Sequence, residues 1–137
     1  MKIFIDTGFW LALEMENDQY HVKAKEQFAL LRSQKARLFT NDYVISETVT
    51  RLIYDSHLKA AEKFWGKITI GTQKMLTLLA VDYDCKEQAW VELKRFRDHK
   101  LSFTDGTIVA NFKLYRLDKI FTFDKHFKDI NLPTNEF

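Results

Sequence analysis

The chain has 137 residues, enough for one domain that buries roughly two-thirds of its unfolded surface without disulfides or a structural metal. Its single cysteine, Cys85, cannot form an internal disulfide, and no pattern of Cys and His suggests a zinc site, so we expect a reducing cytoplasm. We see no export signal and no run of the ~20 apolar residues that a membrane span requires. The formal net charge of +2 permits a polyanionic partner but does not argue for one.

The chain opens on a short apolar run, Lys2–Ile5, that stops at Asp6 and is followed by Thr7 and Gly8. A run without polar alternation is typical of a strand in a parallel sheet that helices cover on both faces. Ligands of open α/β sheets gather beyond the carboxyl ends of the strands, so Asp6 is a candidate site residue. The structural alternative is that Asp6 or Thr7 caps a helix that begins near Phe9.

Strands and helices are predicted to alternate along the rest of the chain. The patterns indicate helices over residues 9–15, 20–34, 43–56, 59–72, 84–99 and from 102 onward, with strands over residues 37–40, 75–81 and 119–123. The acids Asp84 and Glu87 have the spacing of a helix start, and Trp90 is placed on the inward face of that helix. This alternation implies right-handed crossovers around a parallel sheet, and therefore one α/β domain.

Two further acids lie on predicted helices. Glu47 falls nearly opposite the apolar face of its helix, so periodicity alone indicates a solvated residue paired with Arg51, worth ~0.2–0.5 kcal/mol. Asp105 lies on an inward face, where a carboxylate is costly unless it is capped, paired or bound to a cation. The alternative for Asp105 is a capping box with Ser102 as the N-cap.

The last predicted strand ends at Asp124, much as the first ends at Asp6. If these two strands lie near each other in the sheet, their terminal acids come together. Carboxylates that converge without His or Cys are hard oxygen ligands, suited to Mg²⁺ or Mn²⁺. Asp42 and Asp82 also follow predicted strands but are left out of the predicted site.

A set of short motifs, in this order and on these predicted elements, resembles the PIN-domain nucleases. The motifs are Asp6-Thr7-Gly8, Tyr20-His21 followed by Ala24, Glu47, Ser102-Phe103-Thr104-Asp105 and Phe123-Asp124. The chain is most similar to the single-domain ribonuclease toxins of type II toxin–antitoxin systems, the VapC-like proteins. The resemblance covers essentially the whole chain and implies one three-layer α/β/α domain over residues 1–137, with a central, mostly parallel sheet of four to five strands.

The resemblance also implies a set of site residues. The metal-binding and catalytic acids carry over as Asp6, Glu47, Asp105 and Asp124, with Mg²⁺ or Mn²⁺ as the cofactor. The hydroxyl groups of Thr7, Ser102 and Thr104 are predicted to support the acids or a metal-bound water, and Arg51 to contact a substrate phosphate. Gly106 is a departure, because Ala is more usual after the third acid.

The implied activity is endonucleolytic hydrolysis of RNA by a metal-activated water, leaving 5′-phosphate and 3′-hydroxyl ends, as the toxin of a toxin–antitoxin pair. Implied partners are the RNA substrate, a second copy of the chain and an antitoxin that blocks the site. Tyr54, Phe64 and Trp65 are candidates for the antitoxin groove, with core packing as the alternative for each.

Other functions remain as alternatives. One is a catalytically inactive PIN fold that binds RNA or protein, and another is a housekeeping RNA-processing nuclease. A nucleotide-binding enzyme is disfavoured because Gly66-Lys67 lacks the other residues of a phosphate-binding loop. An aspartyl-phosphate phosphatase is disfavoured because Gly8 occupies the place of the second Asp in that family.

Overall fold

The fold is built around a parallel sheet in which the first strand is central. A computed structural model describes residues 1–71 and 75–137. Within these residues, four parallel strands lie in the order β3-β2-β1-β4. They are β1 (Lys2–Ile5), β2 (Arg37–Asn41), β3 (Leu76–Leu79) and β4 (Lys119–Phe121). The parallel sheet predicted from the sequence is therefore confirmed, and β4 lies directly beside β1.

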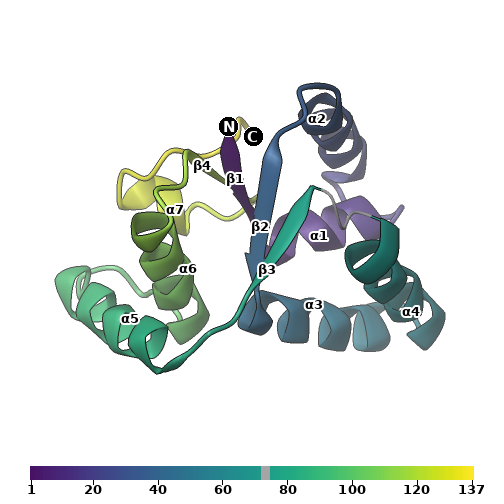
Figure 1. Cartoon of the computed structure of the whole chain (residues 1–137). Helices are drawn as coiled ribbons and strands as arrows, with labels where there is room; N and C mark the ends of the chain where they lie inside the picture. Colours follow the sequence, from purple (N-terminus) through teal and green to yellow (C-terminus); the bar gives the residue numbers. More distant parts are fainter. Residues whose placement is uncertain (72–74) are drawn as a thin grey trace.

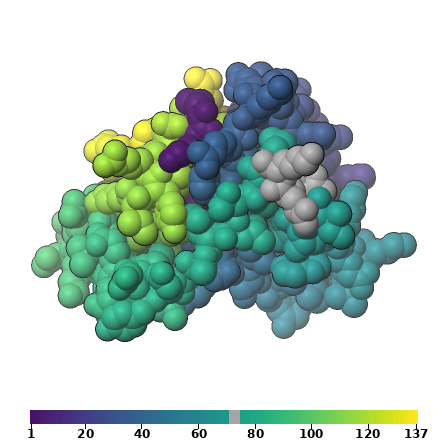
Figure 2. Space-filling view, in the orientation of Figure 1, coloured from purple at the N-terminus to yellow at the C-terminus, as the bar shows by residue number. Residues whose placement is uncertain are grey.

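Helices cover both faces of this sheet (Figure 1). They are α1 (Thr7–Glu14), α2 (His21–Ser33), α3 (Asp42–Asp55), α4 (Leu58–Gly66), the π-helical segment η1 (Lys67–Gly71), α5 (Tyr83–Arg95), α6 (Phe103–Leu114) and α7 (His126–Asp129). Figure 1 shows α1 to α4 on one side of the sheet and α5 to α7 on the other, and Figure 2 shows the same separation of blue and green residues on the surface. This arrangement confirms the three-layer α/β/α prediction. None of the described helices is long and apolar enough to cross a membrane.

The bounds of several elements differ from the prediction: α1 begins at Thr7, and the strands predicted over residues 75–81 and 119–123 are shorter at Leu76–Leu79 and Lys119–Phe121. Two helices differ further from their predicted bounds. The helix predicted to reach Thr72 ends as an α-helix at Gly66 and continues as η1, and its predicted last residue lies outside the described residues. The start predicted at Asp84 and Glu87 is also wrong. Asp82 caps α5 instead, because its Oδ1 accepts a hydrogen bond from the Cys85 amide at 2.9 Å.

The inward face of α5 also differs from the prediction. Trp90, expected to be buried, is 54% exposed. The buried residues of α5 are Cys85, Ala89 and Glu92, which are spaced by four and three positions and so lie on one helical face. Glu92 is tolerated there because Lys113 Nζ contacts both of its carboxylate oxygens, at 2.7 and 2.9 Å.

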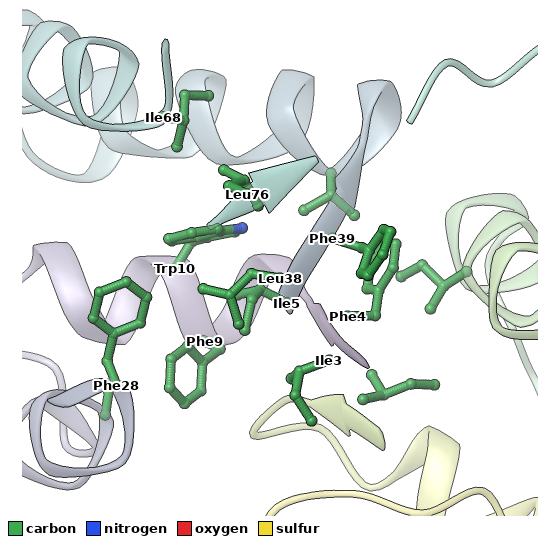
Figure 3. Close-up of a cluster of buried hydrophobic side chains, with 14 of the residues drawn as sticks. Ile3, Phe4, Ile5, Phe9, Trp10, Phe28, Leu38, Phe39, Ile68 and Leu76 are labelled. Carbon is green, nitrogen blue, oxygen red and sulfur yellow. The ribbon is translucent and has the colours of Figure 1, made fainter. Parts of the chain in front are cut away.

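The core is formed by side chains that alternate between the two faces of β1 and β2 (Figure 3). Phe4 and Phe39 point to one face, while Ile5 and Leu38 point to the other, toward Trp10. Burying one such side chain completely stabilises the fold by about 1.5–3 kcal/mol. This two-sided burial explains why the first strand reads as an unbroken apolar run.

Phe64 belongs to this core and not to a surface groove. Its side chain is fully buried, and its ring packs edge-on against Trp10 with the ring centroids 5.4 Å apart. Its place among the groove candidates is therefore wrong, whereas Tyr54 and Trp65 are exposed.

Gly106 lies where α5 and α6 approach each other closely. A Cβ atom at this position would be 3.1 Å from the carbonyl oxygen of Ala89 and 3.2 Å from Cγ of Leu93. The departure from the family pattern therefore has a structural reason, because this helix pair leaves little room for a side chain.

We expect Gly106→Ala to lower the free energy of unfolding by about 1 kcal/mol, because crowding against a backbone carbonyl outweighs the better helix propensity of Ala. Gly66→Ala is the matched control, since a Cβ at Gly66 meets nothing within 4 Å. That control should be neutral or slightly stabilising in urea unfolding. Equal stability of the two variants would contradict the close contact at Gly106.

Candidate functional site

A cavity of about 920 Å³ contains all four predicted acids in its lining. Asp6 follows β1, Glu47 lies on α3, Asp105 lies in the first turn of α6, and Asp124 lies between β4 and α7. The acids are thus separated by up to 118 positions in the sequence and come from four parts of the fold. The parallel strand order brings them to one edge of the sheet, as expected for an α/β fold.

Asp6 is the most buried of these acids and is held by two hydrogen bonds. Its side chain accepts from the Thr7 amide at 2.7 Å through Oδ1 and from the Thr122 hydroxyl at 2.9 Å through Oδ2. Burial raises the pKa of Asp6 to about 7, although both hydrogen bonds oppose this shift. The negative charges of Asp105 and Glu47 raise the pKa further. Asp6 therefore caps α1, as the structural alternative proposed, and also faces two of the other acids.

Asp105 forms the predicted capping box with Ser102. The Asp105 amide donates to Ser102 Oγ at 3.0 Å, and the Ser102 amide donates to Asp105 Oδ2 at 3.0 Å. This arrangement fixes the carboxylate at the positive end of α6. The same Oδ2 atom lies 3.2 Å from His126 Nδ1, inside the cavity lining. The capping alternative is confirmed, and it holds the carboxylate at the cavity.

His126 bridges two of the acids, a role that the sequence did not suggest. Its Nδ1 atom lies 3.2 Å from Asp105 Oδ2 and 3.3 Å from Asp124 Oδ1. The backbone amide of His126 also donates to Asp124 Oδ1 at 2.9 Å. Such a turn, in which an Asp accepts from the amide two residues later, is the local signal that could have identified His126.

Thr122 was also missed in the sequence. Its hydroxyl donates to Asp6 and accepts a hydrogen bond from the Asp124 amide at 3.0 Å. It thereby connects two of the predicted acids through one side chain. A polar residue at the end of β4, directly beside β1, is the signal that could have identified it once the strand order was known.

Glu47 is an exposed residue on α3 that lines the cavity. The expected pair with Arg51 is wrong, because Arg51 Nε lies 3.4 Å from Asp55 Oδ2 instead. Glu47 is therefore placed toward Asp6 without that partner, and its charge acts on Asp6. Arg51 also lines the cavity. Its contact with a substrate phosphate stays a prediction.

The three predicted supporting hydroxyl groups differ in their surroundings. Ser102 is engaged in the capping box, and Thr104 lines the cavity. Thr7 Oγ1 is buried and has no hydrogen-bond partner among the described residues. A buried hydroxyl without a partner is costly, and this one lies next to Asp6 in the cavity lining.

A divalent metal ion of the Mg²⁺ type requires several oxygen ligands close together. Within residues 1–71 and 75–137, no three His, Cys, Asp or Glu side chains are already drawn together as a metal site. Repulsion among Asp6, Glu47 and Asp105 disfavours closer approach without a cation. The donor chemistry nevertheless fits a hard cation, because the four acids supply only oxygen ligands and Thr7 leaves a hydroxyl oxygen unsatisfied beside them.

Asp42 and Asp82, which were left out of the predicted site, have structural roles, and so does His21. Asp42 Oδ2 accepts a hydrogen bond from the Val81 amide at 2.9 Å, and Asp82 caps α5. His21 Nδ1 lies 2.7 Å from the Ala12 carbonyl oxygen and so joins α2 to α1. None of these three side chains lines the cavity of the acids.

The sequence profile of the PIN domain matches residues 3–132, and the chain therefore belongs to the PIN-domain family. It is 30% identical over 128 residues to the 23S rRNA-specific endonuclease VapC20 of Mycobacterium tuberculosis, covering 91% of each chain. The crystal structure of that VapC20, titled a sarcin–ricin loop cleaving toxin, has a TM-score of 0.82 at 30% identity over 95% of each chain.

Two further solved structures share the fold at lower identity. VapBC2 from Rickettsia felis, bound to a DNA fragment from its promoter, has a TM-score of 0.71 at 13% identity over 98% of each chain. FitAcB from Neisseria gonorrhoeae has a TM-score of 0.66 at 15% identity, over 98% of this chain and 96% of that one.

The raised pKa of Asp6 predicts how stability depends on pH. Between the ordinary value of 3.8 and about 7, the folded protein binds more protons at Asp6 than the unfolded chain does. The contribution of Asp6 to the free energy of unfolding therefore falls as pH rises through this window and is constant above it. At about 1.4 kcal/mol per pKa unit, the full loss is on the order of 4 kcal/mol.

We expect Asp6→Asn to remove this pH dependence and to be more stable than wild type at pH 8 without metal. The gain should be smaller than the full loss, because the NH2 group of Asn replaces one of the two carboxylate oxygens that accept from Thr7 and Thr122. Urea unfolding of both proteins at pH 5 and pH 8 in chelator measures the difference. Parallel pH dependences would contradict a desolvated Asp6.

Proposed function

We propose that this chain is a metal-dependent endoribonuclease that hydrolyses RNA phosphodiester bonds, and that it is the toxin of a toxin–antitoxin pair. The observation that carries the proposal is the cavity in which Glu47, Asp105 and Asp124 share the lining with the desolvated Asp6. The similarity to VapC20 over 91% of the chain supports RNA as the substrate. We propose that residues 1–137 form one nuclease domain and that it acts in the cytoplasm.

The residues that would hold the cation are Asp6, Glu47, Asp105 and Asp124, and Mg²⁺ or Mn²⁺ suits their oxygen ligands. When bound, such a cation supplies a nucleophilic water at neutral pH and neutralises charge on the phosphate. Thr122 and the Thr7 amide orient Asp6, and Ser102 orients Asp105.

Cationic side chains line the same cavity as the acids. Arg51, Lys100 and Lys125 all contribute to its lining. Their charges are suited to binding the phosphates of an RNA strand, which the four acids of the same cavity would otherwise repel.

The proposed substrate is ribosomal RNA, and within it the sarcin–ricin loop of 23S rRNA. This choice rests on VapC20, a 23S rRNA-specific endonuclease that cleaves the sarcin–ricin loop and is 30% identical to this chain over most of both chains. Purified protein should be incubated with intact ribosomes, an isolated sarcin–ricin hairpin and an unrelated hairpin, with Mg²⁺ or Mn²⁺. Cleavage of the unrelated hairpin alone would contradict the specific substrate while supporting the nuclease activity.

We expect cleavage to require the metal and the acids. Asp6→Asn, Glu47→Gln and Asp105→Asn should each lower the cleavage rate at least about 100-fold, beyond the 10- to 100-fold loss typical of groups that only orient ligands. Asp42→Asn and Asp82→Asn are matched controls, because these acids follow strands but lie outside the cavity. Activity that survives exhaustive chelation would contradict the metal-dependent reaction.

A catalytically inactive RNA-binding module is the second candidate. The observation that favours it is that the described acids are not already drawn together as a metal site. The same cleavage assay separates the two functions. Tight RNA binding with no cleavage in either metal would support the binding module.

An antitoxin partner is proposed to dock on α3 and α4. A groove of about 370 Å³ lies there, and Val49, Leu58 and Trp65 are among its lining residues. Trp65, which lines this groove, is 53% exposed, and Tyr54 near the end of α3 is 81% exposed. A homodimer is also proposed, with exposed apolar residues of α5 such as Trp90 and Val91 as candidate contacts.

Expression of this chain alone is expected to arrest bacterial growth, because an RNA-cleaving toxin without its antitoxin depletes an essential RNA. Asp6→Asn, which removes a proposed metal ligand, should relieve the arrest at the same protein level. Colony counts and immunoblots of both strains measure the effect. Harmless expression of a protein that cleaves RNA in vitro would instead favour a housekeeping nuclease.

A further inference from the structure

Three aromatic rings are stacked in parallel between the core and the cavity of the acids. The ring of Phe9 on α1 lies 5.4 Å from that of Phe123, with an interplanar angle of 11°. Phe123 in turn lies 4.4 Å from Tyr20, with an angle of 3°. Phe9 is fully buried, whereas Phe123 and Tyr20 are partly exposed and line the cavity. The stack therefore runs from the core to the cavity and ends at Tyr20.

The C-terminal residues hold this stack in place. Phe137 meets both Tyr20 and Phe123 edge-on, with centroid distances of 6.4 and 5.7 Å and angles of 82° and 85°. Lys128 Nζ lies 3.8 Å from the centroid of the Phe137 ring, a cation–π contact that restrains Phe137. Phe137 therefore contacts the rings of Tyr20 and Phe123 at the side, while Phe9 stacks on Phe123 from the core.

The stack is also connected to the buried acid. Asn135, in the same C-terminal segment, accepts a hydrogen bond from the Thr122 amide through Oδ1 at 2.7 Å. The Thr122 hydroxyl donates to Asp6, and Phe123 is the next residue in the chain. The stack of Phe9, Phe123 and Tyr20 is therefore held at a fixed distance from Asp6, the centre of the proposed site.

Tyr20 and Phe123 share the cavity with the cationic side chains of Arg51, Lys100 and Lys125. Sites that bind single-stranded nucleic acid combine these two features, because cations follow the phosphates while each exposed base stacks on an aromatic face. A base inside a duplex is already stacked on both sides and cannot use such a face. The combination in this cavity therefore favours an unpaired nucleotide.

We propose that Tyr20 stacks against an unpaired nucleobase beside the scissile phosphate and thereby sets which nucleotide of the RNA lies at the acids. This inference rests on the proposed ribonuclease function and names a base-binding residue in the same cavity. The stacking contact exists before and during the reaction, so it lowers KM and leaves kcat nearly unchanged.

The test uses RNA hairpins with the fluorescent base 2-aminopurine at successive loop positions, or at one stem position as a control. Rapid mixing with wild-type protein and Mn²⁺ should quench one loop position before cleavage, whereas the stem position, which is already quenched by stacking within the duplex, should show no change. Tyr20→Leu should abolish this quenching and raise KM on the order of 10-fold, whereas Tyr20→Phe should behave as wild type. Tyr83→Leu is the matched control, because Tyr83 is 72% exposed and does not line the cavity.

A second variant guards against loss of folding in Tyr20→Leu, which circular dichroism melts would reveal. Phe137→Leu removes the edge-on support but leaves Tyr20 in place, and it should weaken quenching and raise KM by a smaller factor. Unchanged KM and quenching in the folded Tyr20 and Phe137 variants would overturn the inference while leaving the nuclease function intact. Equal cleavage of looped and fully paired RNA would overturn it as well. A wild-type protein that cleaves no RNA would overturn the proposed function and the inference together.

Discussion

A carboxyl group held out of water at the end of the central strand is the constraint on which the site depends. Asp6 can occupy this place because β1 lies between β2 and β4, so its last residue is enclosed by both neighbours. The Asp6 amide continues the sheet by donating to the Phe121 carbonyl oxygen at 3.0 Å. Two hydrogen bonds to the side chain offset part of the desolvation cost but do not restore an ordinary pKa. A nearby cation stabilises the charged form of such a desolvated carboxyl more than that of a carboxyl in water.

Around Asp6, a short series of hydrogen bonds joins segments that are distant in the sequence. Asn135 accepts from Thr122, which donates to Asp6 and accepts from Asp124. Asp124 in turn lies against His126, which reaches Asp105. Networks of this kind fix side-chain positions more firmly than separate pairs do. The C-terminal segment therefore contributes to the site through Asn135, although none of its residues after Asp129 lines the cavity.

Much of the fold could be predicted from the sequence because the strands are apolar runs that stop at polar residues. The same pattern placed Asp6 and Asp124 at strand ends, where parallel strands necessarily bring such residues to one edge. Glu47 could not be placed by periodicity, because its role depends on which way α3 lies across the sheet. Family resemblance placed it correctly at the cavity, and the expected pair with Arg51 was wrong because Asp55 is equally near along the helix.

Other features depended on tertiary contacts that no local pattern contains. Trp90 was predicted to be buried, but α6 packs against the neighbouring face of α5, where Ala89 and Glu92 lie. His126 and Thr122 acquire partners only because β4 pairs with β1. Mutual repulsion among the acids that meet at this edge contributes to the raised pKa of Asp6. Desolvation is nevertheless the largest cause, because enclosure by the sheet removes more water than the sequence indicates.

The most direct measurement is an NMR titration of the Asp6 side-chain carboxyl carbon, with and without saturating Mg²⁺. Without metal, the titration midpoint should lie near 7, as burial beside Asp105 and Glu47 requires. With Mg²⁺, the midpoint should move far below 7, because a bound cation favours the charged carboxylate. A metal-free midpoint near 3.8, or one near 7 that Mg²⁺ leaves unchanged, would contradict a metal site centred on Asp6.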